Sequence, residues 1–117
     1  MAEINFLTPG TPEADSFPAV GHTYETDLGG DILVQFEYHS VNSMTIHGLK
    51  GEHKGFTEPV ELSVLPIRPG VFMVGWQEKN TTTVTHIEDF ENDNLYTNIT
   101  LPGNKSLRLQ RYFKQVK

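Results

Sequence analysis

Short segments of alternating apolar and polar residues, separated by turn residues, recur at intervals of about a dozen residues from Gly21 onward. In the clearest early example, Ile32, Val34, Phe36 and Tyr38 fall on one face, which is the period-two pattern of a half-buried strand. No interval between these segments is long enough for the helix that a parallel crossover needs. The pattern therefore predicts an all-β fold in which consecutive strands pair antiparallel.

About eight strands are predicted, each bounded by glycine, proline, asparagine or serine. Their predicted ranges are 22–28, 31–38, 44–47, 60–67, 71–78, 82–90, 94–101 and 106–113. Eight consecutive antiparallel strands close most simply into an up-and-down barrel, which leaves no free sheet edge and is wide enough to hold one small ligand. The last range also fits a helical stripe of apolar residues, so a helical C-terminus stays open.

The first part of the chain has a different composition. Residues 1–20 contain Pro9, Gly10, Pro12 and Pro18, which predict an irregular N-terminal arm. The chain has 117 residues, a length typical of one domain, so residues 21–117 are expected to form a single barrel domain.

Composition excludes several classes of function. The chain has no cysteine, which rules out a disulfide framework, a thiolate metal site and a cysteine nucleophile. Its 9 Lys and Arg against 15 Asp and Glu give a net charge of −6, which argues against general nucleic-acid binding. No apolar run approaches the ~20 residues of a membrane span, and the N-terminus has no basic segment of a secretory signal. We therefore expect a cytoplasmic protein with no membrane and no nucleic-acid partner.

The densest pattern is the pair of predicted strands 71–78 and 82–90. Alternation places Phe72, Val74, Trp76 and Glu78 on one face of the first strand. With a three-residue loop, Trp76 would lie opposite Val84; with a two-residue or four-residue loop, its partner would be a threonine instead. Alternation alone leaves this register open.

The three-residue loop would gather apolar and ionisable side chains on one inward face. Phe72, Trp76, Val84 and, from a later strand, Ile99 would provide apolar contact with a ligand. Polar groups of that ligand would be oriented by four further residues, Tyr24, Glu78, His86 and Glu88. These eight residues are the predicted binding site.

Residues 21–101 resemble the MoaF-like family of small calycin-type barrels, named for molybdenum-cofactor biosynthesis protein F. They are also similar, more remotely, to the cofactor-free phenolic acid decarboxylases. The residues that carry the resemblance are Gly21-His22-Thr23-Tyr24, the turn 48–51, Pro69-Gly70-Val71-Phe72-Met73-Val74-Gly75-Trp76-Gln77-Glu78, residues 83–90 and Tyr96-Thr97. The resemblance implies a lipocalin-like barrel, often dimeric, with an interior pocket. It favours the three-residue loop, because the Trp-x-Glu pair lines the pocket in the decarboxylases.

The same resemblance counts against decarboxylation. Glu78 stands at the position of the decarboxylases' acid, but their paired tyrosines are reduced to Tyr24. Their arginine is also missing after the glycine-rich bend, where Lys54 is a neighbour without the planar guanidinium that clamps a carboxylate. Whether the protein is an enzyme therefore stays open, and Glu78 is the catalytic candidate if it is a lyase.

No metal or other cofactor is predicted. His86 and Glu88 lie two residues apart on one face and are typical of metal ligands, but no second histidine follows at a matching spacing. The segment 89–94 resembles a calcium loop yet has Asn94 where the loop needs glycine and Thr100 where it needs glutamate. A hydrogen-bonded histidine and an acidic turn are the simpler interpretations.

The opposite face of the hairpin carries Val71, Met73, Gly75, Thr85 and Ile87, a partly apolar surface that predicts a homodimer. Three functions follow, in order of preference. The first is a barrel that binds a small organic ligand, aromatic or bearing a carboxylate, in its interior. The second is a cofactor-independent lyase acting on an aromatic acid, with Tyr24 and Lys54 placing the carboxylate. The third is a dimeric structural or interaction module.

Overall fold

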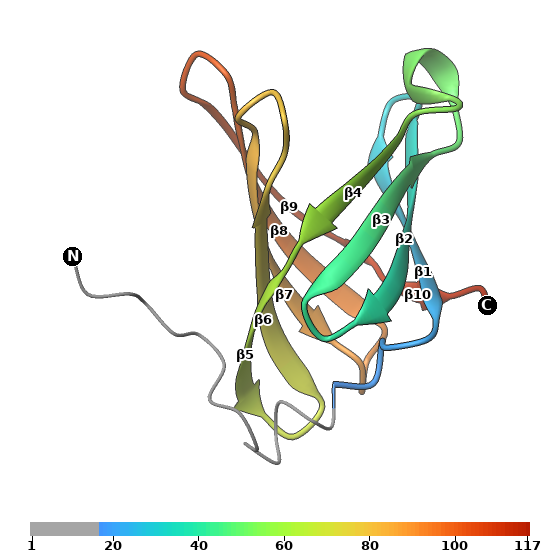
Figure 1. Cartoon of the computed structure of the whole chain (residues 1–117), viewed down its shortest axis with the longest axis vertical. Coiled ribbons are helices and arrows are strands. Elements are labelled where there is room, and N and C mark those ends of the chain that lie inside the picture. The colour runs from blue at the N-terminus through green and yellow to red at the C-terminus, as the bar shows by residue number, and fades with distance from the viewer. Residues whose placement is uncertain (1–16) are drawn as a thin grey trace.

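The computed structural model describes residues 17–117, which form two five-stranded antiparallel sheets and one short 3₁₀ helix (Figure 1). The first sheet has the order β10-β1-β2-β3-β4 and the second has the order β5-β6-β7-β8-β9. The elements are β1 Thr23–Gly29, β2 Ile32–Ser40, β3 Ser43–Gly48, η1 Gly51–His53, β4 Thr57–Glu61, β5 Ser63–Arg68, β6 Val71–Gln77, β7 Thr83–Asp89, β8 Asn94–Leu101, β9 Lys105–Tyr112 and β10 Lys114–Gln115. The all-β prediction is confirmed. Most of the predicted N-terminal arm, residues 1–16, lies outside the described residues.

The chain passes directly from one sheet to the other at two single residues. Leu62 separates β4 from β5 and Phe113 separates β9 from β10, and both side chains are buried. At each point the ladder of one sheet ends and that of the other begins. The predicted closed ring of eight strands is therefore not what the described residues form. The strand predicted at 60–67 extends across the break at Leu62, whereas the strand predicted at 106–113 ends at the break at Phe113. The C-terminal segment is extended rather than helical.

The register of the β6–β7 hairpin is the one that the three-residue loop predicts. Trp76 lies opposite Val84, and Val74 lies opposite His86. The loop is closed by the Glu78 N–H, which donates to the Thr82 carbonyl at 2.8 Å, and Thr81 adopts a left-handed φ of 75°. A left-handed third residue is usual in three-residue hairpin loops. The hairpin thus turns the alternate residues of both strands toward the opposite sheet.

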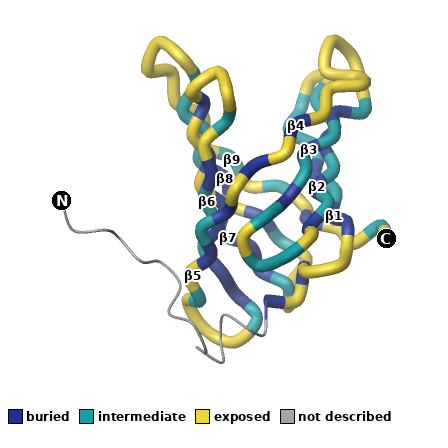
Figure 2. The backbone as a smooth tube through the Cα atoms, in the orientation of Figure 1, coloured by how far each residue is buried: buried dark blue, intermediate teal, exposed yellow. Residues whose placement is uncertain are grey.

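The two sheets pack against each other at one end and diverge at the other (Figure 1). We call the end with the 69–70 and 91–93 turns the closed end. We call the other the open end; it carries the 30–31 turn, η1, the 78–82 loop and the 102–104 turn, which are largely exposed (Figure 2). The closed end is filled by aromatic rings in edge or stacked contact. These belong to Phe17, Tyr24, Tyr38, Phe72, Phe90 and Phe113.

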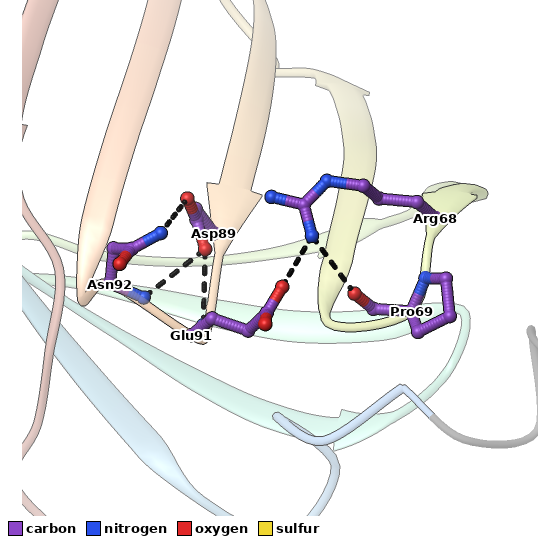
Figure 3. Close-up of polar contacts among 5 residues, drawn as sticks. All are labelled: Arg68, Pro69, Asp89, Glu91 and Asn92. Carbon is purple, nitrogen blue, oxygen red and sulfur yellow. Dashed lines mark hydrogen bonds and ion pairs between the residues drawn. The ribbon is translucent and has the colours of Figure 1, made fainter.

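A hydrogen-bonded turn fixes the closed end after β7 (Figure 3). The Asp89 carboxylate accepts the backbone N–H groups of Glu91 at 3.0 Å and Asn92 at 3.2 Å, and the Asn92 side-chain amide at 2.9 Å. These bonds, that of the Asn92 side chain first, lower the pKa of Asp89. Beside the turn, Arg68 forms an ion pair with Glu91. The segment that resembles a calcium loop in sequence is thus a turn whose first carboxylate is bound to its own backbone.

Candidate functional site: a cavity between the sheets

A cavity of about 450 Å³ lies between the two sheets at the open end. Ligand sites in proteins occupy about 300–1,000 Å³ and are mostly apolar with a few polar groups. Here the apolar lining is Leu28, Ile32, Val34, Phe36, Ile46, Phe56, Trp76, Val84, Ile99, Leu101, Leu107 and Leu109. The polar side chains of the lining are His53, Glu78, Asn80, Thr82, His86 and Thr97. In size and lining, this cavity has the properties of a small-molecule site.

Strand alternation explains which side chains reach the cavity. Ile32, Val34 and Phe36 occupy alternate positions of β2, and Val84 and His86 do so on β7. The sheets diverge toward the open end (Figure 1). Ile32, Val34 and Val84 line the space there, whereas Phe36 and His86 meet deeper in the interior. The floor of the cavity is made of rings in edge contact, with centroids of Trp76 and His86 4.7 Å apart and those of Phe36 and His86 5.2 Å apart.

Trp76 and Glu78 form a hydrogen-bonded pair in the cavity wall. The indole Nε1–H donates to Glu78 Oε2 at 3.1 Å. Burial raises the pKa of Glu78; the Trp76 hydrogen bond opposes this shift and the negative charge of Glu58 adds to it. Glu78 is therefore a carboxyl group that holds its proton to a higher pH than an exposed glutamate, at a position where it can contact a ligand.

A second polar cluster lies below the floor, in the packed part of the interior. Glu88 Oε2 accepts a hydrogen bond from the Tyr38 hydroxyl at 2.8 Å and lies 2.9 Å from His86 Nδ1. All three side chains are buried, with Glu88 at 0% exposure. Burial, followed by the charge of Glu88, raises the pKa of Tyr38 well above its usual range, so Tyr38 keeps its proton. Within this cluster His86 alone lines the cavity.

The structure brings five of the eight predicted site residues to the cavity wall, namely Trp76, Glu78, Val84, His86 and Ile99. The other three, Tyr24, Phe72 and Glu88, face the same interior but lie in the closed end. Tyr24 stacks on Phe113 with centroids 4.8 Å apart, and Phe72 packs against Phe17 at 5.1 Å. Tyr24 therefore does not stand beside Glu78 in the cavity, and Lys54, which follows η1, is exposed and outside the cavity lining. Contact of these eight residues with a ligand stays a prediction.

Several lining residues were not predicted as site residues. Ile32, Val34 and Phe36 had a signal, because their alternation already places them on one inward face. No alternation indicates Phe56 or His53, because both belong to a glycine-rich segment whose path depends on the rest of the fold. Phe56 and Leu107 stand at the rim and are 41% and 46% exposed, so apolar surface continues from the cavity to the outside.

A larger and more open groove, of about 870 Å³, lies at the crossover from β4 to β5. Glu58 and Glu61 line it on one side and Met73 and Gly75 on the other. Glu58 is not free in this groove, because its Oε2 accepts the Lys79 backbone N–H at 2.7 Å. Glu78 borders both spaces. The cavity between the sheets is the better candidate site because it is more enclosed than the groove and its lining is more apolar.

Two further features are absent from residues 17–117. No three histidine, aspartate or glutamate side chains of this part of the chain come together in a way that could hold a metal ion. The same residues include no helix with the length and apolar character needed to cross a membrane.

The fold and site define a class of small proteins in which two antiparallel sheets enclose a cavity. Residues 20–114 match the MoaF-like family, and the chain belongs to it. It is also similar to a solved structure from Burkholderia vietnamiensis described as a "putative beta-lactamase". The two share 27% sequence identity and superpose with a TM-score of 0.78, over 85% of this chain and 96% of the other. A search of curated proteins gave no match.

Proposed function

We propose that this protein binds a small organic molecule, aromatic or bearing a carboxyl or hydroxyl group, in the cavity between its sheets. The observation that carries the proposal is the cavity itself, about 450 Å³ of space with an apolar wall and a few convergent polar groups. Membership of the MoaF-like family is consistent with a binding role without specifying the ligand. A cytoplasmic location stays a prediction.

The wall indicates the chemistry of the ligand. Trp76 and Phe36 offer ring surface to a flat molecule, and Ile99 and Val84 offer aliphatic contact. Glu78 holds its proton more strongly than an exposed glutamate; its carboxyl donates to an oxygen of the ligand when protonated and accepts from a ligand hydroxyl when ionised. A molecule with one aromatic ring and one oxygen-bearing substituent fits these features.

Binding is directly measurable because the chain has one tryptophan and that residue lines the cavity. We would first compare native and denatured masses of freshly purified protein, then titrate a panel of substituted benzoic acids, cinnamic acids and phenols while following tryptophan fluorescence. We expect saturable quenching by some members. Val84→Phe should weaken it several-fold by taking up the space beside Trp76, whereas Ile87→Phe, on the other face of the same strand, should leave it unchanged. A folded protein that retains no extra mass and responds to no panel member would contradict the proposal.

Two enzymatic alternatives receive less support. A lyase would need Tyr24 beside Glu78, but Tyr24 is packed on Phe113 outside the cavity lining. Hydrolysis of a β-lactam, suggested by the name of the Burkholderia protein, usually needs a Ser-x-x-Lys nucleophile or a metal cluster. The sequence contains no Ser-x-x-Lys, and residues 17–117 bring no metal-ligating group together. Product analysis of the cinnamic acid samples would detect a lyase if one is present.

We also propose a homodimer that uses the outer face of the second sheet. Register places Leu65, Met73, Ile87 and Tyr96 in one row across four strands, and Leu65 and Tyr96 are 36% and 47% exposed. Val71 was predicted to be part of this surface, but it is buried. Such a row suits a self-complementary contact. Light scattering after size exclusion should give a dimer that Ile87→Glu converts to a monomer and Lys105→Glu, at the end of β9, does not; a monomeric wild type would contradict this.

A further inference from the structure

The buried cluster of Tyr38, Glu88 and His86 is not explained by stability. Burying ionisable groups costs free energy that hydrogen bonds offset only partly, and well-packed apolar residues of similar volume often stabilise a core as well or better. The surroundings here are apolar rings, including Phe36 and Phe113 against His86. The cluster also touches the cavity, through His86. Its position suggests a role in what the cavity binds.

The hydrogen bonds of the cluster converge on one carboxylate oxygen. Both the Tyr38 hydroxyl and His86 Nδ1 are directed at the same oxygen, Glu88 Oε2. If Glu88 carried a proton on Oε1, that proton would have no acceptor, because Oε1 has no partner among the described residues. We take the arrangement in which Glu88 Oε2 accepts from both groups, which corresponds to the His86 tautomer with its hydrogen on Nδ1. The Nδ1 of His86 then carries a hydrogen, and its Nε2 is left with a lone pair.

The cavity side of His86 is free to meet a ligand. His86 lines the cavity, and its Nε2 has no hydrogen-bond partner in residues 17–117. Thr97 lies directly opposite His86 on β8 and also lines the cavity. Its buried hydroxyl likewise has no partner among the described residues. A basic nitrogen and a hydroxyl therefore stand side by side, and both lack a partner.

We propose that the cavity selects weak acids, such as phenols and carboxylic acids, and that His86 accepts the acidic proton of the bound molecule. This inference rests on the proposed binding function. The O–H bond of the ligand breaks and an N–H bond forms at His86 Nε2, while the electron pair stays on the ligand oxygen. The resulting imidazolium lies between the ligand anion and the Glu88 carboxylate, an arrangement in which a buried carboxylate orients and stabilises a protonated histidine. The Thr97 hydroxyl donates a second hydrogen bond to the ligand anion.

In this proposal Glu88 and Tyr38 are positioning residues that act through His86. Besides them, Tyr24 on β1 interacts with Glu88, and two more ionisable residues, Glu78 after β6 and His53 at the end of η1, line the same cavity as His86. His53 is exposed, unlike the buried His86. Burial, then the charge of Glu88, raises the pKa of Tyr24, so it stays neutral where ligands would be tested. Glu78 is separated from His86 by the indole of Trp76, which contacts both. His86 is thus the acceptor that the geometry favours.

The test uses 4-nitrophenol, whose neutral and anionic forms absorb at different wavelengths, and 4-nitroanisole, which has a similar ring and no acidic proton. Both are added to the full-length protein in a buffer where most of the free phenol is protonated. Binding is followed by tryptophan fluorescence and the ionisation state by absorbance. We expect the bound phenol to be ionised, with its apparent pKa lowered by about one unit, a tenfold change in the acid–anion ratio. The anisole should bind without a spectral change.

Variants then test whether the residues around His86 control the ionisation of the bound phenol. Glu88→Gln keeps the size of the side chain and should abolish the ionisation of bound phenol while leaving anisole binding in place. If Glu88→Gln does not fold, Tyr38→Phe, which removes one hydrogen bond to the carboxylate, should change the bound anion fraction measurably. Thr97→Val should weaken binding of the phenol several-fold more than binding of the anisole.

The outcomes separate the two proposals. If both probes bind and the phenol stays neutral in the wild type, the proton-acceptor role is wrong and the binding function stands. The same conclusion follows if the phenol is ionised to an equal extent in the wild type and in the folded variants of Glu88 and Tyr38. If neither probe binds at any concentration tested, nor any acid of the wider panel, both proposals fail.

Discussion

The closed end and the open end of this protein are built from the same strands but packed in different ways. On β6, Phe72 lies at the closed end and touches Phe17 and Phe90, whereas Trp76, four residues further along, lines the cavity. On β7, Glu88 is buried in the closed end, whereas Val84, four residues earlier, lines the cavity. The sheets meet at one end and diverge at the other (Figure 1). Side chains from both sheets fill the interior at the first end and leave the cavity at the second. The closed end thus provides most of the packing that stabilises the fold, whereas the open end provides the space for the proposed ligand.

The boundary between the two ends is a layer of rings. Phe36, Trp76 and His86 contact one another edge to face, with centroids 4.7–5.7 Å apart. Above this layer the wall is mostly aliphatic; below it lie the aromatic cluster and the Tyr38–Glu88 hydrogen bond. The layer supports the cavity from below, and His86 connects it to the buried carboxylate. The comparison between the ends leads to four predictions.

The largest effect is expected for Phe113→Ala. Phe113 has 0% exposure, connects β9 to β10 and contacts Tyr24, Phe36, Phe90 and His86. Removing a buried ring costs about 3–5 kcal/mol of unfolding free energy. Leu109→Ala on the same strand, a half-buried residue of the cavity wall, should cost about 1 kcal/mol because the space beside it is already empty. Urea unfolding followed by tryptophan fluorescence measures both, and equal losses would remove the distinction between the ends.

A pair of valine substitutions probes the space directly. Val74 has 0% exposure and Val84 lines the cavity, and both are inward residues of the same hairpin. Val74→Phe should lower the unfolding free energy by about 1–3 kcal/mol, because a larger side chain in a filled core forces its neighbours to move. Val84→Phe has room and should change it by less than about 1 kcal/mol. Thermal unfolding of the two variants compares them, and an equally damaging Val84→Phe would show that no usable space exists beside it.

The features that local sequence controls were predictable. Alternation and turn residues give the strands, and the resemblance of the 71–90 hairpin to known barrels gives its three-residue loop. The division into two sheets was not predictable, because it depends on bends at Leu62 and Phe113. Leu62 continues the apolar alternation of Val60 and Val64, so nothing in that pattern distinguishes a bent strand from a straight one. Before Phe113 the alternation is interrupted at Arg111, but an interruption alone does not show that the strand changes sheet.

The sequence predicts which side chains face the interior, but it does not predict whether each one lies at the closed end or at the open end. Alternation correctly turns Tyr24, Phe72, Trp76 and Glu88 toward the interior, since all four are buried. It contains no information on how far the opposite sheet lies at each level, and that distance decides whether a side chain meets another ring or the cavity. Only Trp76 of these four lines the cavity. A prediction of the site from one sequence therefore includes core residues with the lining residues.

A smaller effect is expected for Asp89→Ala at the closed end. The variant removes the acceptor of three hydrogen bonds, of which those from the Glu91 and Asn92 backbones hold the turn, and should cost about 1–2 kcal/mol. Because the pKa of Asp89 is lowered in the folded state, its stabilisation is present above the pKa of an unfolded aspartate, near 4, and is lost as the pH falls through the lower folded value. Unfolding curves recorded at neutral pH and along an acid series should converge for the two proteins at the lowest pH. A constant difference at all pH values would mean that the carboxylate is not the cause.

The smallest effect, at the open end, has the opposite sign with pH. The pKa of Glu78 is raised in the folded state, so folding holds a proton that the unfolded chain releases. The wild type should therefore lose stability as the pH rises from the unfolded value, near 4.5, through the raised folded value, and keep that loss at neutral pH. Glu78→Gln, which still accepts the Trp76 hydrogen bond, should not show this decline. At neutral pH it should be as stable as the wild type or more so, by less than about 1 kcal/mol because the carboxyl group is only half buried. If Glu78→Gln instead destabilises the protein at neutral pH, the ionised carboxylate contributes to the stability of the fold. Glu78 would then stabilise the open end rather than lower its stability.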